Sequence, residues 1–260
     1  MSYVEIPPPA ELHPWVAAFW CFGVRAGAGE IEHRIPLTGG LLLSVDRSGL
    51  PMLAGPRTAP LVTTVRGGDL FRGVHFHPGG ARPFLHLPPG SLRDAMGPAH
   101  LWLDRAWCGS WGPVAGGEDD MAALDALARG LRELMPRAEP PDPVVRSAVD
   151  SLRRSLRTEQ ADQGTRVEEL AAEVRLSPRQ LRRRFQAAVG LSPKELARVL
   201  RLRSSAASAV LGVRPWADVS AEGGFADQAH LVREFRSLLG VTPGRFEQHA
   251  RRIDHRLLPE

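Results

Sequence analysis

The C-terminal part of the chain carries the same short pattern twice, at a constant offset of 50 residues. Each copy has a leucine, a phenylalanine, a glycine and a hydroxyl residue before proline: Leu181, Phe185, Gly190 and Ser192-Pro193, then Leu231, Phe235, Gly240 and Thr242-Pro243. A fixed offset indicates one supersecondary unit built twice. We expect each unit to hold two short helices joined by a tight turn, with the second helix ending at the glycine. The repeat therefore predicts two helix-turn-helix units in tandem.

Residues 167–189 are expected to form the first unit. Val167–Val174 has the apolar spacing of a short helix, and Arg175–Ser177 follows as the turn. Ser177 suits an N-cap, and Pro178 suits the first helical position because its missing N–H would have no partner there. These signals predict that the second helix of the unit begins at Pro178.

That second helix is predicted to have one apolar face and one basic face. Leu181, Phe185 and Val189 recur at four-residue steps and form the expected buried stripe. The opposite face holds side chains at i, i+3, i+4 and i+7: Arg179, Arg182, Arg183 and Gln186. An arginine-rich helix face is usually only solvated, but this one follows a capped turn in a repeated unit. A helix of this kind can enter the major groove of DNA, where arginine reads guanine.

Residues 215–239 are expected to form the second unit, with a first helix over Ala217–Glu222 and Asp227 as the N-cap of the second. The core positions of the second helix are Leu231, Phe235 and Leu238 or Leu239. Its outward face holds Gln228, His230, Arg233 and Arg236, with Ala229 and Val232 between them. This face is less charged than the first. We therefore expect the first helix to dominate affinity for DNA and the second to tune it.

A spacer helix is expected between the units, over Pro193–Leu211, with a length of about 28 Å at about 1.5 Å per residue. Successive major-groove segments on one side of DNA lie about 34 Å apart. A rigid spacer of this length would let one chain read two half-sites without dimerising.

The net charge of +4 is unevenly distributed. Residues 164–256 hold 17 Lys+Arg against 10 Asp+Glu, a balance of +7, whereas residues 1–163 hold 16 against 18, a balance of −2. Glu260 supplies the remaining −1. A biased genome composition can explain the use of arginine instead of lysine, but it does not explain this placement. The positive potential lies on the repeated half, where phosphates would be met.

Residues 143–250 resemble the DNA-binding domain of the AraC/XylS family of bacterial transcription regulators. The resemblance is carried by Leu170-Ala171, Ser177–Phe185, Gly224–His230, Arg233, Phe235 and Gly240–Pro243. It implies that the second helix of each unit enters the major groove, with Arg179, Arg182 and Arg183 as readers in the first unit and Gln228, His230 and Arg233 in the second. Two residues depart from the family pattern: Arg175 stands where glycine is usual and Ser220 where alanine is usual. Neither is expected to break the fold.

The predicted fold class is α+β with two domains. Residues 1–113 are rich in Gly and Pro and contain strand-length runs such as 41–45, 61–65 and 74–76, with one short turn over Pro14–Trp20. Together with His13-Pro-Trp15, the segment Gly73–Phe84 resembles the cupin-like N-terminal domain found on some of these regulators. A helix and a proline-rich linker are expected over residues 114–142, and the all-α DNA-binding domain over 143–260.

The N-terminal half offers little catalytic chemistry. His75 and His77 could face one metal ion as His-x-His on a strand, but no carboxylate follows until Asp94, so no metal or other cofactor is expected. Cys21 and Cys108 lack basic neighbours in sequence that would activate a thiol. Tryptophans at 15, 20, 102, 107 and 111 could line a ligand cavity, although most are expected to fill the core. The sequence does not identify effector-binding residues.

These observations predict a bacterial DNA-binding transcription regulator and not an enzyme. The alternatives are a metal-dependent cupin enzyme, a repair protein that carries a DNA-binding module, and a protein whose C-terminal half binds a protein partner. The expected partner is double-stranded DNA, with RNA polymerase and a small-molecule effector as further candidates. Monomer and homodimer both stay open. No signal segment or apolar run of membrane length is present in the sequence, so the cytoplasm is the expected location.

Overall fold

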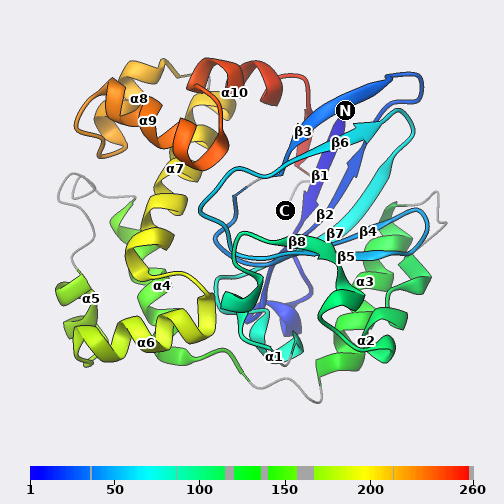
Figure 1. The fold of residues 1–260 in the computed structure, drawn as a ribbon, viewed down its shortest axis with the longest axis horizontal. Helices are drawn as coiled ribbons and strands as arrows, with labels where there is room; N and C mark the ends of the chain where they lie inside the picture. The colour runs from blue at the N-terminus through cyan, green and yellow to red at the C-terminus, as the bar shows by residue number, and fades with distance from the viewer. Residues whose placement is uncertain are drawn as a thin grey trace.

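The computed structural model describes residues 1–35, 37–85, 87–114, 120–135, 140–156, 167–212 and 214–257. A β-rich region occupies one side of the molecule and a group of helices the other (Figure 1). This arrangement confirms the predicted two-domain α+β class. None of the helices in these ranges is long and apolar enough to cross a membrane.

The β-rich region is built on a seven-stranded sheet. Its strand order is β8 (Met96–Pro98), β5 (Pro51–Ala54), β4 (Leu42–Asp46), β7 (Leu70–Phe76), β2 (Val16–Gly23), β1 (Ser2–Ile6) and β9 (Asp254–Leu257). Neighbouring strands are antiparallel except β1 and β9, which are parallel. A separate antiparallel pair, β3 (Glu30–Arg34) and β6 (Val62–Arg66), faces the cavity described below. This two-sheet arrangement agrees with the cupin-like expectation.

One face of the large sheet is covered by short helices and one long helix. They are η1 (Ala10–Leu12), α1 (Arg82–Leu85), η2 (Pro89–Leu92), η3 (Ala99–Leu101), α2 (Arg105–Gly109), η4 (Gly112–Val114) and α3 (Asp120–Leu134). Leu124, Leu127 and Leu131 of α3 lie in the same apolar core as Phe19 and Val74 of the sheet. The buried guanidinium of Arg72 on β7 pairs with Asp120 at 3.1 Å, which fixes the start of α3.

The described residues of the C-terminal region form seven helices: α4 (Pro143–Ser155), α5 (Val167–Glu173), α6 (Pro178–Val189), α7 (Pro193–Leu211), α8 (Trp216–Glu222), α9 (Gln228–Leu239) and α10 (Pro243–Ala250). Helix α7 runs between a lower group, α4 to α6, and an upper group, α8 to α10 (Figure 1). The lower group packs around Leu181 and Phe185, and the upper group around Leu231 and Phe235. Two separate cores therefore share one connecting helix.

The structure changes two of the predicted domain limits. A helix and a proline-rich linker were expected over 114–142; helix α3 lies in this segment, and its apolar stripe packs in the core of the large sheet. Residues 254–257 were expected in the DNA-binding domain, but β9 pairs with β1 because that edge offers unpaired backbone groups. Residues 136–139 of the predicted linker lie outside the described residues.

The turn expected over Pro14–Trp20 is also shorter than predicted. It covers only residues 13–15, and β2 begins at Val16. This strand is buried on both faces, so it lacks the alternation of polar and apolar residues by which a half-exposed strand is recognised.

Candidate nucleic-acid interface

The turn of the first unit forms as the sequence predicts. The Ser177 hydroxyl accepts a hydrogen bond from the Gln180 N–H at 3.3 Å, and the Ser177 N–H donates to the Gln180 side-chain carbonyl at 3.0 Å. This capping box satisfies the first backbone donors of α6. Arg175 in the turn has φ 56°, a left-handed conformation that explains why glycine is usual there.

Helix α6 presents all four of its predicted DNA contacts to solvent. Leu181 and Phe185 are 0% exposed, and Arg179, Arg182 and Arg183 lie exposed on the other face. Arg182 makes an ion pair with Glu168 of α5 at 3.5 Å, between two exposed side chains. Such a pair contributes little to stability, so it leaves the guanidinium available to a ligand.

Gln186 is placed differently from the other three. It is exposed, but its side-chain amide donates to the Gly190 carbonyl at 3.0 Å, at the C-terminal end of α6. It also lies next to Gly90 of the β-rich region. The structure therefore sets Gln186 apart from the arginine cluster, although its assignment as a DNA contact stays a prediction.

Arg184, the third of three consecutive arginines, has a structural role. Its guanidinium donates twice to the Asp142 carboxylate, at 2.9 Å each. Asp142 also caps α4 by accepting from the Val144 and Val145 N–H groups. The ion pair therefore ties α6 to the start of α4, while Arg182 and Arg183 point away from the core.

Helix α9 repeats the design of α6. Asp227 caps it by accepting from the His230 N–H, and Leu231 and Phe235 are fully buried. The exposed side chains are Gln228, Arg233 and Arg236, as predicted. Arg233 lies 3.8 Å from Asp227, again as an exposed pair.

His230 is half-buried and has a defined orientation. Its Nδ1 accepts a hydrogen bond from the Ala226 N–H at 3.3 Å, and its ring meets the edge of Phe225 at 5.6 Å. Because Nδ1 is an acceptor, the neutral ring carries its proton on Nε2. His230 thus holds the turn of the second unit and can offer one N–H to a ligand.

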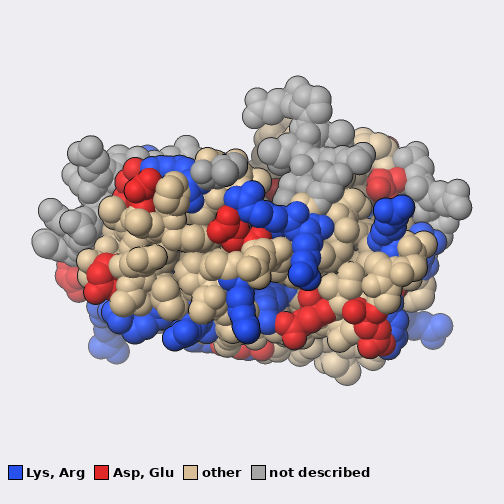
Figure 2. All heavy atoms as spheres, turned by 90° about the horizontal axis from the view of Figure 1, so that it is seen from above, with Lys and Arg blue, Asp and Glu red and all other residues tan. Residues whose placement is uncertain are grey.

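Lysine and arginine are spread over the face shown in Figure 2, and one group of them follows its lower left edge, the end that Figure 1 assigns to the C-terminal helices. A cluster of this sign attracts phosphate groups. The eight predicted DNA contacts thus lie on two helices of one domain, and their roles stay predictions.

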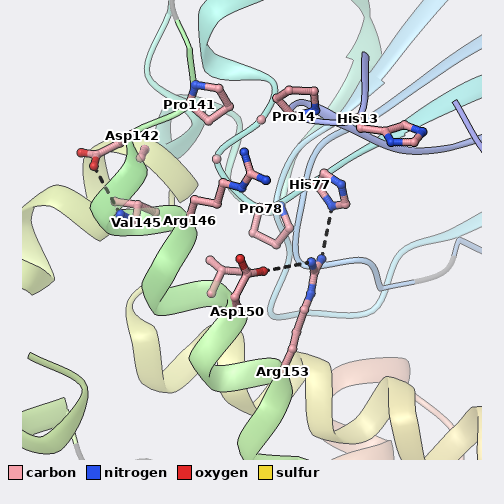
Figure 3. Close-up of a pocket in the computed structure, with 14 residues that line it drawn as sticks. His13, Pro14, His77, Pro78, Pro141, Asp142, Val145, Arg146, Asp150 and Arg153 are labelled. Carbon is pink, nitrogen blue, oxygen red and sulfur yellow. Dashed lines mark hydrogen bonds and ion pairs between the residues drawn. The ribbon is translucent and has the colours of Figure 1, made fainter. Parts of the chain in front are cut away.

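His75 and His77 do not converge on one site. His75 lies inside a large cavity of the β-rich region, where the Tyr3 hydroxyl is 3.1 Å from its Nε2. His77 follows the end of β7 and lines a smaller hollow beside α4, with its Nδ1 3.4 Å from Arg153 (Figure 3). The strand ends between them, so the same-face geometry of a His-x-His pair is lost. Among the described residues, no three His, Cys, Asp or Glu side chains are grouped as metal ligands.

A large cavity lies in the structure, and Trp20 is the tryptophan in its wall among those that the sequence suggested as cavity residues. It has a volume of about 530 Å³ and lies between the strands and helices α7 and α10. Its walls include Trp20 and Phe22 from the sheet and Ala206 and Val210 from α7. Of the other tryptophans, Trp107 and Trp111 are buried in the core, and Trp15 and Trp102 pack against it. Which strand residues face the cavity depends on how the two sheets and α7 pack together, and a local sequence pattern does not determine that packing.

Two protein families match parts of the chain. Residues 170–249 match the helix-turn-helix domain family, and residues 4–98 match a domain of unknown function, DUF6597. No curated protein matches the chain.

Several solved structures are similar to parts or most of the chain. The C-terminal domain of AraT, a response regulator from Geobacillus stearothermophilus, is 20% identical and covers 46% of this chain and 90% of its own, with a TM-score of 0.38. A probable AraC family transcriptional regulator from Rhodopseudomonas palustris CGA009 is 23% identical and covers 42% and 98%, with a TM-score of 0.36. ToxT from Vibrio cholerae O395 is 10% identical and covers 95% and 96%, with a TM-score of 0.45.

The family match falls on the repeated units that the sequence singled out. It begins at Leu170 in α5 and ends at His249 in α10, so it spans both second helices and the connecting helix. Residues 170–249 therefore match a helix-turn-helix domain family, and residues 4–98 match a domain family without an assigned function.

Proposed function

We propose that this protein is a sequence-specific DNA-binding transcription regulator that reads two adjacent major-groove segments with α6 and α9. The observation that supports it best is the matched design of these helices. Each is capped at its start, buries a leucine and a phenylalanine four residues apart, and ends at a left-handed glycine. Each also exposes arginines on the opposite face.

The mechanism combines phosphate contacts with base readout. Exposed arginines on α6 reach guanine edges or phosphates, and α9 offers Gln228, the His230 N–H and Arg233. Contacts to phosphate fix the position of the protein on the duplex, and contacts to base edges supply sequence preference. Bacterial DNA lies in the cytoplasm, which is the compartment that this function implies.

The large cavity supports a second part of the proposal, regulation by a small molecule. Its volume of about 530 Å³ is in the range of ligand sites, and most of its walls are apolar or aromatic. Its walls come from both domains, since Ala206, Ala207 and Val210 belong to α7, which carries both reading units. A ligand that contacts both domains favours one arrangement of them, which links occupancy to DNA affinity.

Selection of bound duplexes from a random pool tests the DNA-binding function. We expect enriched duplexes with two conserved half-sites about 10–10.5 base pairs apart, and binding that weakens steeply as salt rises. Binding without enrichment of any sequence would contradict sequence-specific reading. Absence of salt-dependent binding, together with tight binding of RNA polymerase, would favour the protein-partner alternative.

Metal analysis of the purified protein tests the enzyme alternative. His75 and His77 open into different cavities, so we expect no stoichiometric iron, zinc or manganese held by them. Stoichiometric metal that is lost in a His75→Phe variant would restore a cupin-enzyme reading. The C-terminal reading helices would then serve to localise that activity on DNA.

A further inference from the structure

Both reading helices end against one short segment of the N-terminal domain. Gly190 closes α6 with φ 81°, and Gly240 closes α9 with φ 72°. A Cβ added at Gly190 would come within 2.9 Å of the Pro56 side chain and 2.8 Å of the Gly90 nitrogen. The end of α6 is therefore in direct contact with the N-terminal domain.

The end of α9 meets the same segment four residues later. A Cβ added at Gly240 would come within 3.2 Å of the Pro60 ring. The Arg34 guanidinium donates to the Leu239 carbonyl at 3.4 Å, so it satisfies a last-turn acceptor of α9. Residues 55–60, which we call the strap, thus contact α6 through Pro56 and α9 through Pro60.

The strap is held rigidly from its own domain. The Asp94 carboxylate accepts from the Thr58 N–H at 2.6 Å and from the Ala59 N–H at 3.1 Å. The Gly55 N–H donates to the Ala95 carbonyl at 3.0 Å, and the Asp94 N–H donates to the Pro56 carbonyl at 3.1 Å. Hydrogen bonds at both ends and prolines with fixed φ leave the strap little freedom.

An ion pair connects the residue next to Asp94, which holds the strap, to the spacer helix α7. The Arg93 guanidinium lies 2.6 Å from the Glu195 carboxylate in the first turn of α7, and it donates to the Thr58 hydroxyl at 3.3 Å. Burial raises the pKa of Glu195, but hydrogen bonds from Ser192 and then from Arg93 outweigh it and hold that pKa below its ordinary value. Arg93 therefore connects the strap directly to the first turn of α7.

The two reading units lack a common core that would fix their relative orientation. The core around Phe185 and the core around Phe235 are separate clusters, joined through α7. Each core includes residues of α7: Leu196, Ala197 and Leu200 in the first, and Val199, Leu202 and Ala206 in the second. Among the described residues, each unit is therefore held to α7 by its own core, and neither core joins α6 directly to α9. The strap is a second connection between the reading helices besides α7, whose Arg198 pairs with Glu234 of α9 at 2.9 Å.

We propose that the strap sets the separation and relative rotation of α6 and α9, and so determines how many base pairs between half-sites the protein accepts. The proposal rests on DNA reading by α6 and α9. Adding one base pair between half-sites turns one of them by about 34–36° around the duplex, so a rigid pair of helices tolerates one separation only. Pro56, Pro60 and Asp94 are thus specificity-determining residues that need not touch DNA.

The test uses the full chain and duplexes in which the selected half-sites are fixed and their separation varies. For the unchanged protein we expect affinity to fall about tenfold when the separation changes by one base pair. Asp94→Gly removes the carboxylate that accepts from the Thr58 and Ala59 N–H groups, and glycine accepts the left-handed φ of 54° at this position without strain. In this variant we expect a change of one base pair in the separation to lower the affinity by only about threefold or less, and the selected half-site sequences to stay the same.

Arg93→Gln provides a second, milder variant that removes the ion pair to Glu195. We expect it to change the separation profile in the same direction as Asp94→Gly. Asp69→Gly is the matched control, because Asp69 also accepts from a turn N–H, that of Arg66 at 2.7 Å, between β6 and β7. It should leave the profile unchanged.

The outcomes separate the strap from the DNA-binding function. A profile in Asp94→Gly and Arg93→Gln within twofold of the unchanged protein would overturn the role of the strap. If the unchanged protein enriches no duplex, the DNA-reading function itself fails. Should Asp94→Gly not fold, Arg93→Gln alone decides the question.

Discussion

Arg175 shows how one residue can carry strain within an otherwise regular unit. It lies in the turn between α5 and α6 with φ 56°, and its side chain is exposed. A residue with a Cβ is disfavoured in this region, whereas glycine adopts it freely. Hydrogen bonds from the Arg175 and Leu176 N–H groups to carbonyls of α5 keep the turn closed.

Replacing Arg175 by glycine should stabilise the protein. We expect the free energy of unfolding to rise by about 0.5–1 kcal/mol in urea denaturation, since relief of the left-handed strain outweighs the flexibility that glycine adds to the unfolded chain. Arg179→Gly is the matched control, and it should be destabilising because Arg179 has helical geometry in α6. A less stable Arg175→Gly variant would show that the arginine side chain contributes more than the strain removes.

Substitutions of Arg182 and Arg183 test base reading most directly. Replacement of either by alanine should weaken binding to the selected duplex by about 1–3 kcal/mol if the side chain contacts a base. Titrations with the selected duplex and with an unrelated duplex distinguish the two roles. Equal loss on both would make that arginine a phosphate contact. Arg129→Ala, on the exposed face of α3, is the control and should leave both affinities unchanged.

At the scale of elements, each reading unit depends on its own aromatic centre. Phe235 is fully buried and meets Trp216 of α8 and Phe246 of α10 edge to face, at 5.0 and 5.6 Å. Phe185 fills the equivalent place in the first unit. The two residues lie in different clusters, so loss of one should leave the other unit folded.

We expect Phe235→Ala to lower the free energy of unfolding of the second unit by about 3–5 kcal/mol, through lost burial and a residual cavity. Amide hydrogen exchange should show loss of protection in α8 to α10 and retained protection in α6. Phe246→Ala, at a partly buried ring, should cost less. Uniform loss of protection across α4 to α10 would mean that the two cores act as one.

At the scale of the whole molecule, a histidine pair marks the contact between the domains. His33 of β3 and His249 of α10 have ring centroids 5.6 Å apart, and His33 also stacks on Phe22 at 4.4 Å. Burial lowers the pKa of His33 to about 4, with a smaller contribution from His249. Burial also lowers the pKa of His249, and Arg34 and Arg252 add to that effect.

Because burial lowers the pKa of His33, we expect the folded protein to lose stability in mild acid. In the unfolded chain, His33 takes up a proton below pH 6.5, whereas in the folded protein it does so only near pH 4. The unfolded state therefore binds more protons in this window, and the free energy of unfolding falls as pH falls, by about 2–3 kcal/mol. Urea denaturation between pH 7 and 4 should show that His33→Phe has a flatter dependence than the unchanged protein. His100→Phe, at an exposed position, should keep the full dependence.

The cavity shared by the two domains gives a further prediction at this scale. A neutral aromatic dye with a carbonyl group, such as prodan, should bind in it and shift its emission to the blue. Ala207→Trp fills the α7 wall and should weaken dye binding by at least about tenfold, whereas Ser204→Trp, exposed on the same helix, should not. Dye binding should also change affinity for the selected duplex, and the duplex should change dye affinity by the same factor. If Ala207→Trp and Ser204→Trp bound the dye equally well, the dye would bind outside the large cavity.

The sequence alone determined the helix-turn-helix domain in detail. Ser177 and Asp227 cap their helices, Gly190 and Gly240 end them, and the spacer covers Pro193–Leu211, all as predicted. These features depend on residues within a few positions of one another, so local hydrogen bonding and the helical period encode them. The outward face of Arg179, Arg182 and Arg183 followed from the same period, whereas the pairing of Arg184 with Asp142 did not.

Only the tertiary structure decided how the domains meet. The place of α3 on the sheet, the pairing of β9 with β1, the separation of His75 from His77, the shared cavity and the strap all join segments that are distant or lie on irregular backbone. Such contacts depend on which apolar faces remain uncovered after local structure has formed, and no periodic pattern records that choice. The chain thus encodes its two reading helices locally, and the packing of one domain against the other fixes how they are held relative to each other.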